Sequence, residues 1–266
     1  ERCRSPHAWR AESEGDDARW LALASRDLEA ILERCGDQLA AIVLEPGMQG
    51  AAGMLTQPPG YVKRVRELAD RSGTLLVLDE VAMGMGRSGA MFASETEGVV
   101  PDFLCLAKGL TGGYLPLAAT LTTEAIFDAF LGERERTFHY GHSYTANQLG
   151  CAAALASLEV FEKESVLEGL SPRVEALAQG LEAIVHPSVH EVRQCGLIAG
   201  LELRQESGER FPAAERMGER VCVAARAHGL LTRPIRDTIV LMPPLCSTTE
   251  EIIGACEALG RAVEEV

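Results

Sequence analysis

The residues best suited to chemistry are a lysine and an aspartate, each at the end of an apolar run. Lys108 follows residues 103–106 (FLCL), and Asp79 follows residues 74–78 (TLLVL). An amine attacks a carbonyl group only when it is unprotonated, and partly desolvated surroundings favour that form. A buried carboxylate needs a cationic or donor partner, and a protonated ring nitrogen would serve. The two residues together predict carbanion chemistry on a heterocyclic ring.

Other interpretations of these residues stay open at this point. The chain has only three lysines, and the spacing of Lys108 alone is equally compatible with a strand-end lysine that is solvated at its tip. Residues 74–80 also fit the magnesium-binding strand of a nucleotide hydrolase, but the accompanying GxxxxGK[ST] loop is absent. Residues 84–89 (GMGRSG) resemble a dinucleotide loop only weakly, so we interpret them as a shaped loop.

Candidate anion and carboxylate ligands lie further along the chain. Ser143 precedes a helix expected to start near residue 146, where it could hold a phosphate, although a cap of that helix by Ser143 or Thr145 is the simpler interpretation. His139 and His142 lack the further ligands of a zinc site, so no metal is expected. Arg233, before a proline, could bind a substrate carboxylate through two hydrogen bonds, although a surface arginine is the simpler interpretation.

The elements that position these residues form an α/β pattern. A helical face over residues 61–69 ends at Ser72 and Gly73 and leads into the strand before Asp79. Ligands of parallel sheets collect at the carboxyl ends of the strands, so Asp79 and Lys108 are expected to face one site. We place a domain change near residue 158. It separates a mostly parallel large domain (1–157) from a smaller α+β domain (158–266), which ends in a helix with a Thr248/Glu251 capping box.

Composition narrows the class of partner. The 266 residues are 47% hydrophobic and carry a net charge of −14, which disfavours nucleic acids and anionic membranes and favours a small-molecule substrate. No apolar stretch approaches the length of a membrane span. The eight cysteines form no CxxC pair, so we expect them to be reduced and the protein to be cytoplasmic.

Four motifs, in order, resemble those of class III aminotransferases. They are residues 44–54 (LEPGMQGAAGM), 78–87 (LDEVAMGMGR), 107–113 (AKGLTGG) and 140–148 (YGHSYTANQ). Residues 49–54, the LTGG after the lysine, Arg233 with Pro234, and residues 241–244 (LMPP) are most similar to the branch of that class that acts in biotin biosynthesis.

The resemblance implies a fold-type I transferase that uses pyridoxal 5'-phosphate. Lys108 would be the Schiff-base lysine and proton shuttle, and Asp79 would pair with the pyridine nitrogen. His142 and Ser143 would reach the cofactor phosphate across a homodimer interface, and Gly141 and Arg233 would line the substrate site. The reaction implied is transfer of an amino group from S-adenosylmethionine or lysine to 8-amino-7-oxononanoate.

The resemblance covers essentially the whole chain but begins partway into the pattern of the class. We therefore expect the N-terminal part to be missing and the large domain to be incomplete. Two alternatives follow: another class III ω-aminotransferase, or a noncatalytic fragment.

Overall fold

The computed structural model describes residues 1–266, which divide into two compact units. Unit 1 comprises Glu1–Gly47, Gln57–Met85 and Phe92–Glu164. Unit 2 comprises Met48–Thr56, Gly86–Met91 and Ser165–Val266. The predicted change near residue 158 therefore falls inside helix α4 (Gln148–Lys163), and the division follows that helix. Two short segments from the first half of the chain also belong to unit 2, which the sequence did not predict.

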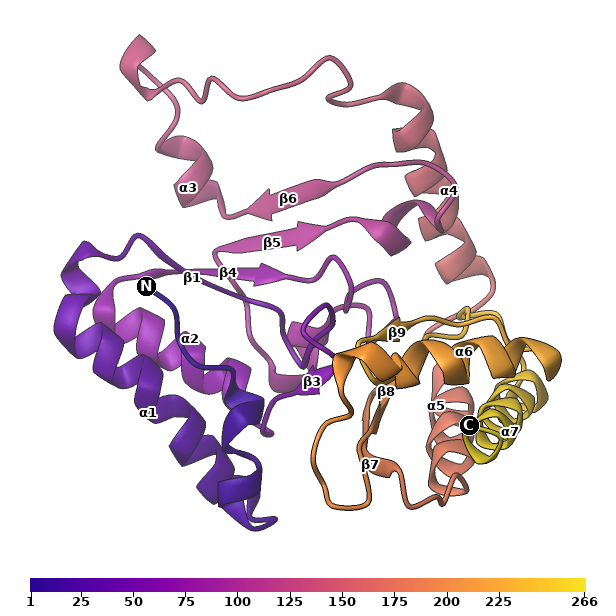
Figure 1. Ribbon diagram of the computed structural model, residues 1–266. Helices are drawn as coiled ribbons and strands as arrows, with labels where there is room; N and C mark the ends of the chain where they lie inside the picture. The colour runs from indigo at the N-terminus through magenta and orange to yellow at the C-terminus, as the bar shows by residue number, and fades with distance from the viewer. The chain divides into compact units, whose positions relative to one another are not determined.

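Unit 1 is built on a four-stranded sheet, shown in Figure 1. Its order is β1 (Ala41–Leu44), β4 (Leu75–Asp79), β5 (Phe103–Leu106) and β6 (Ala119–Thr122). The first three strands are parallel and β6 is antiparallel to β5. The mostly parallel sheet confirms the predicted α/β class of the larger domain.

Helices α1 (Asp17–Cys35) and α2 (Tyr61–Ser72) lie on one face of this sheet (Figure 1). Their apolar sides pack with Leu76 and Leu78 in one core cluster. Gly73 ends α2 in the left-handed conformation, as predicted. The remaining helical elements of unit 1 are α3 (Glu124–Asp128), α4, and the 3-10 helices η1 (Pro6–Trp9), η2 (Ala11–Ser13), η3 (Gly36–Gln38), η4 (Ala93–Glu97), η5 (Lys108–Thr111) and η6 (Arg134–Arg136).

Unit 2 contains an antiparallel sheet and three helices, which confirms the predicted α+β domain. The sheet order is β7 (Val189–Cys195), β8 (Ile198–Leu203), β10 (Thr238–Leu241) and β9 (Pro234–Ile235). Helices α5 (Leu170–Glu182), α6 (Met217–Ala227) and α7 (Thr249–Glu264) share one apolar core with it. The unit also includes η7 (Ala213–Glu215) and the hairpin of β2 (Met48–Gln49) and β3 (Leu55–Thr56).

Local signals in unit 2 account for the last helix. The Thr248 hydroxyl accepts a hydrogen bond from the Glu251 amide at 3.2 Å, and the Glu251 carboxylate accepts one from the Thr248 amide at 2.8 Å. This is the predicted capping box. Fully burying a side chain such as Leu259 contributes about 1.5–3 kcal/mol, so packing outweighs the cap in holding α7. No helix in the chain is long and apolar enough to span a bilayer.

Candidate active site

The sheet of unit 1 brings Asp79 and Lys108 to the same edge. Strands β4 and β5 are parallel, and Asp79 lies opposite Cys105 in the register. The Glu80 amide extends the pairing by donating to the Cys105 carbonyl at 3.0 Å. Lys108 begins η5, two residues after β5 ends. The predicted arrangement of the two residues at adjacent carboxyl ends is therefore present.

The carboxyl group of Asp79 keeps one oxygen available. Its Oδ1 accepts a hydrogen bond from the Val81 amide at 3.0 Å, and the other oxygen has no partner within the chain. The side chain is partly exposed because the strand alternates its faces, and Asp79 lies on the face opposite Leu76 and Leu78. A carboxylate in this position can accept a further hydrogen bond from a ligand.

Lys108 is exposed, so the expectation of a partly desolvated lysine is wrong for the chain by itself. The physical reason is the turn at its position: Ala107 leaves the strand conformation, and Lys108 has a φ of 27°, which directs it out of the apolar run. Its ammonium group has no hydrogen bond or ion pair within the chain. The lysine is thus available to a carbonyl compound.

The loops that follow β4 and β5 pack against each other. A Cβ atom on Gly109 would lie 2.8 Å from the Cβ of Met85, so only glycine fits there. Met85 itself has a φ of 57°, an uncommon backbone conformation for a residue with a side chain. The loop after Asp79 and the turn after Lys108 are therefore fixed relative to each other.

Glu80 is a buried carboxylate that the sequence analysis missed. It is 1% exposed, and its oxygens accept hydrogen bonds from the amides of Ala93 at 2.6 Å and Ser94 at 2.8 Å. Burial raises the pKa of Glu80, and these two hydrogen bonds oppose the rise. The bonds close the loop between Asp79 and η4. Alternation along the strand was the available signal, since Leu76, Leu78 and Glu80 share one face.

Gly141, His142 and Ser143 lie in an exposed segment well before α4. The helix begins at Gln148 and is capped by Asn147, whose side chain accepts from the amides of Leu149 at 2.9 Å and Gly150 at 3.2 Å. The helix therefore begins two residues after the predicted start near residue 146, and neither Ser143 nor Thr145, the alternative caps, caps it. Asparagine favours the N-cap position at least as strongly as serine and threonine do.

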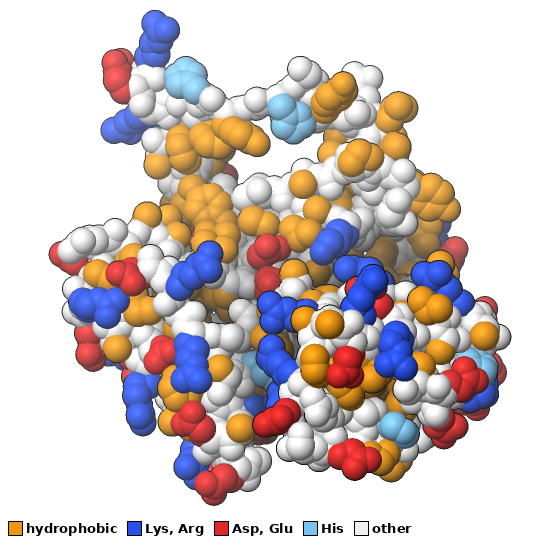
Figure 2. Space-filling view, in the orientation of Figure 1, with side chains coloured by type: hydrophobic (Ala, Val, Ile, Leu, Met, Phe, Trp, Pro, Cys, Tyr) orange, Lys and Arg blue, Asp and Glu red, His pale blue; other side chains and the backbone are white.

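The segment around these residues carries a concentration of exposed apolar side chains. Figure 2 shows hydrophobic side chains on α3 and on the stretch that leads from it to α4. The exposed aromatic residues of this stretch are Phe127, Phe130, Phe138, Tyr140 and Tyr144. Between 45% and 75% of each of these residues is exposed, which is unusual for large aromatic rings.

Arg233 belongs to unit 2 and is exposed. Its carbonyl accepts a hydrogen bond from the Val240 amide at 3.2 Å, while its guanidinium has no partner within the chain. The residue lines a mainly apolar hollow of about 570 Å³ together with Met242 and Pro243. A free guanidinium beside an apolar hollow suits a ligand that has both a carboxylate and a hydrocarbon part.

Comparison with known proteins agrees with this chemistry. The family described as aminotransferase class-III matches residues 5–263. The chain is 49% identical, over 94% of its length, to the adenosylmethionine-8-amino-7-oxononanoate aminotransferase of Nitratidesulfovibrio vulgaris, and 48% identical, over 90%, to that of Geobacter sulfurreducens. It spans 47% and 54% of the length of these two relatives, or about half.

Solved structures give the same result. The adenosylmethionine-8-amino-7-oxononanoate aminotransferase of Methanocaldococcus jannaschii superposes with a TM-score of 0.88 at 41% identity, covering 91% of this chain and 57% of that one. An amine transaminase from an uncultivated Pseudomonas species, solved in its PLP-bound form, superposes with a TM-score of 0.86 at 37% identity, covering 94% and 58%. Both are transaminases by name.

Proposed function

Since the chain belongs to the class-III aminotransferase family, we propose that it carries the cofactor lysine, Lys108, of a pyridoxal-phosphate-dependent transaminase. One observation carries this proposal. An exposed amine without a partner and a carboxylate with one free oxygen follow adjacent parallel strands at the same sheet edge. The likeness to a PLP-bound transaminase structure supports the choice of cofactor.

The donor set fits the chemistry of this cofactor. Pyridoxal 5'-phosphate, when bound, supplies a carbonyl carbon that combines with amines and a ring that accepts an electron pair. The Lys108 amine would hold the carbonyl carbon and move a proton at the neighbouring carbon. The free oxygen of Asp79 would hold the proton on the ring nitrogen, because a carboxylate favours the charged form of a base beside it.

We propose His142 and Ser143 as contacts of the cofactor phosphate, acting across a homodimer. The Ser143 hydroxyl has no partner within the chain, and His142 is exposed beside it. The exposed aromatic residues of the same segment support a second subunit as the partner, because water-exposed rings of this number mark an interaction surface.

The substrates proposed follow the names of the relatives. An amino group would pass from S-adenosylmethionine, or lysine, to 8-amino-7-oxononanoate. The free guanidinium of Arg233 supports a substrate that ends in a carboxylate, and its apolar hollow supports a hydrocarbon chain. Gly141 would be a further residue of the substrate site. None of the eight cysteines forms a disulfide, which supports a cytoplasmic location.

A second acceptor is favoured by one observation. A thermostable (S)-enantioselective ω-transaminase from Thermomicrobium roseum superposes with a TM-score of 0.91, although its identity to this chain is only 31%. This likeness supports another class III ω-aminotransferase as the alternative. Substrate assays must therefore include a simple ketone.

The test is a transamination assay on the natural protein with 8-amino-7-oxononanoate or a simple ketone as acceptor. S-adenosylmethionine and lysine are supplied as alternative donors. Product formed from 8-amino-7-oxononanoate, and lost in Lys108→Ala but kept in Lys163→Ala, supports the proposal. Lys163 is the matched control because it is exposed and pairs only with Glu159. Equal activity in both variants would refute the role of Lys108, and turnover of the ketone alone would refute the acceptor.

A further inference from the structure

Glu80 is a buried carboxylate that the proposed chemistry does not use. It is 1% exposed, yet no arginine, lysine or histidine pairs with it, and the neighbouring charge that acts on it is the like charge of Glu95. An ionised carboxylate is costly to bury without a cation, and an apolar residue at this position would simply continue the buried face of β4. The presence of a carboxylate here is therefore explained by the hydrogen bonds that it makes.

The two oxygens of Glu80 hold the start of η4. They accept hydrogen bonds from the amides of Ala93 at 2.6 Å and Ser94 at 2.8 Å. These amides belong to the first two residues of η4, so they have no acceptor within the helix itself. The carboxylate thus joins the end of β4 to a segment that begins 13 residues further along the chain.

The turn after β4 folds back over the same side chain. The Gly84 amide donates to the Glu80 carbonyl at 2.9 Å. A Cβ atom on Gly84 would lie 3.3 Å from the Cβ of Glu80 and 3.4 Å from its Oε2, so the turn packs directly on the carboxylate. The position of the Glu80 side chain therefore fixes the backbone of residues 80–84.

This turn carries the amide that orients Asp79. The Val81 amide donates to the Oδ1 of Asp79 at 3.0 Å, and the other oxygen stays available. Asp79 and Glu80 point to opposite faces of the strand, so Glu80 lies on the side away from any ligand of Asp79. The direction of the Asp79 carboxylate therefore depends on where the Glu80 side chain holds the backbone.

We propose that Glu80 is a positioning residue for Asp79, the carboxylate proposed to pair with the ring nitrogen of the cofactor. Glu80 anchors its turn to η4, the turn presents the Val81 amide, and that amide sets the direction of the Asp79 carboxylate. A charge-assisted hydrogen bond depends on direction as well as distance, so a loosened turn weakens the hold on the ring. This role rests on the proposed function, and Glu80 itself touches neither the cofactor nor the reacting atoms.

Glu97 offers a matched control at the other end of η4. Its carboxylate also accepts two backbone amides, from Gly60 at 3.0 Å and Lys63 at 2.8 Å, and so ties η4 to the start of α2. Replacing either glutamate by glutamine removes a charge and one acceptor, so both changes should lower the midpoint of urea unfolding. Only Glu80→Gln releases the turn beside Asp79.

The test compares Glu80→Gln and Glu97→Gln with the natural protein. Two quantities are measured beside the urea midpoint. They are hydrogen exchange at the amides of Val81 and Gly84 without the cofactor, and the dissociation constant for pyridoxal phosphate, read from its absorbance band. Glu80→Asp is a second variant, because it keeps the charge and shortens the side chain by a single methylene.

Glu80→Gln is expected to speed exchange at both amides about tenfold or more and to raise the dissociation constant about tenfold, the loss expected when one bond to a charged group is weakened. Glu80→Asp is expected to lie between Glu80→Gln and the natural protein in both quantities. Glu97→Gln is expected to leave both within about twofold, because its bonds are made at the far end of η4.

An unchanged dissociation constant in Glu80→Gln, or equal effects in the two glutamine variants, would overturn the proposal. If Glu80→Gln does not fold, the same comparison between Glu80→Asp and Glu97→Asp decides the question. A natural protein without a cofactor band that depends on Lys108 would instead refute the proposed function, and the exchange data would still decide whether Glu80 holds the turn.

Discussion

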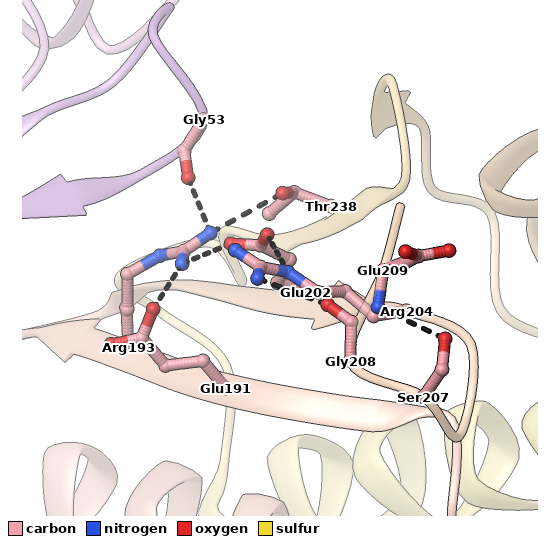
Figure 3. A network of polar contacts seen from close by, with 9 residues as sticks. All are labelled: Gly53, Glu191, Arg193, Glu202, Arg204, Ser207, Gly208, Glu209 and Thr238. Carbon is pink, nitrogen blue, oxygen red and sulfur yellow. Dashed lines mark hydrogen bonds and ion pairs between the residues drawn. The ribbon is translucent and has the colours of Figure 1, made fainter. Parts of the chain in front are cut away.

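Two segments from the first half of the chain belong to unit 2, and an arginine guanidinium holds each of them in a different way. In the β2/β3 hairpin the guanidinium comes from the sheet, as Arg193, which donates to a carbonyl of the turn and is neutralised by two carboxylates (Figure 3). In the loop Gly86–Met91 it comes from the segment itself, as Arg87, and donates only to the carbonyls of Leu197 at 2.9 Å and Pro243 at 2.6 Å. Burial accordingly lowers the pKa of Arg87.

The difference shows which of the two arginine contacts depends on charge. Removing Arg193 leaves two carboxylates close together, one of them on a buried strand, whereas removing Arg87 leaves only carbonyl groups unsatisfied. A buried charge that loses its partner costs far more than a carbonyl that loses a donor. The stability of the hairpin contact made by Arg193 should therefore depend on charge and on pH. The stability of the loop contact made by Arg87 should depend on how well the groups fit together.

The largest effect is expected for Arg193→Met. This change should lower the free energy of unfolding by about 3–5 kcal/mol, because it leaves Glu191 and Glu202 without their shared cation. Urea unfolding followed by circular dichroism measures it. A loss below about 1 kcal/mol would show that the ion pairs contribute little to unit 2.

Gly196→Ala should lower the free energy of unfolding nearly as much as Arg193→Met does, through steric clash and backbone strain without any change of charge. A Cβ atom on Gly196 would lie 2.3 Å from the backbone of Ser88, and the φ of 57° is also unfavourable for alanine. Overpacking and strain together predict a loss of about 3 kcal/mol in urea unfolding. Gly254→Ala in α7 is the control, since nothing lies within 4 Å of its Cβ position, and it should change stability by about 1 kcal/mol at most and in the favourable direction.

Arg87→Met should cost less, about 1–3 kcal/mol. Two carbonyl groups lose a donor, but a partly buried cation without an acidic partner is also removed, which offsets part of the loss. The same unfolding experiment ranks it against Arg193→Met. If Arg87→Met proved the more destabilising of the two, the contrast between the anchors would be wrong.

The smallest and most specific effect concerns how the stability of the hairpin depends on pH. Burial alone would raise the pKa of Glu202, but its bonds to Arg193 and Arg204 outweigh burial and lower it. A lowered carboxyl pKa means that the stabilisation is complete above the ordinary value of 4.5 and is lost as the pH falls through the folded value. As the pH falls, the amides of the hairpin should lose protection from hydrogen exchange before those of the loop Gly86–Met91 do. The exchange rates must be corrected for their intrinsic pH dependence. Glu202→Gln should weaken this dependence, and equal loosening of both segments would contradict it.

The sequence was informative where one strand or helix determines the outcome. Apolar runs located the ends of β4 and β5, and so placed Asp79 and Lys108 at one edge. The capping box at Thr248 was also local. By contrast, Asn147 and Thr145 are both residue types that favour the N-cap position. Their types alone therefore do not predict which of them caps α4.

The remainder depends on contacts between distant residues. The bond from Arg193 to Gly53 joins residues 140 apart, and the one from Arg87 to Pro243 joins residues 156 apart. No local pattern assigns Met48–Thr56 or Gly86–Met91 to unit 2, so the predicted boundary missed both. Glu80 was missed for a different reason: its neighbour Asp79 was taken as the buried carboxylate, whereas strand alternation buries Glu80.

The central claim is that Lys108 binds the cofactor. The most direct measurement is the absorbance spectrum of the natural protein with added pyridoxal phosphate, recorded beside Lys108→Ala and Lys163→Ala. Borohydride reduction and peptide mapping then identify the modified residue. We predict a band near the visible edge in the wild type and in Lys163→Ala, no band in Lys108→Ala, and the cofactor mass on Lys108. A band that survives in Lys108→Ala, or a label on another residue, would contradict the account.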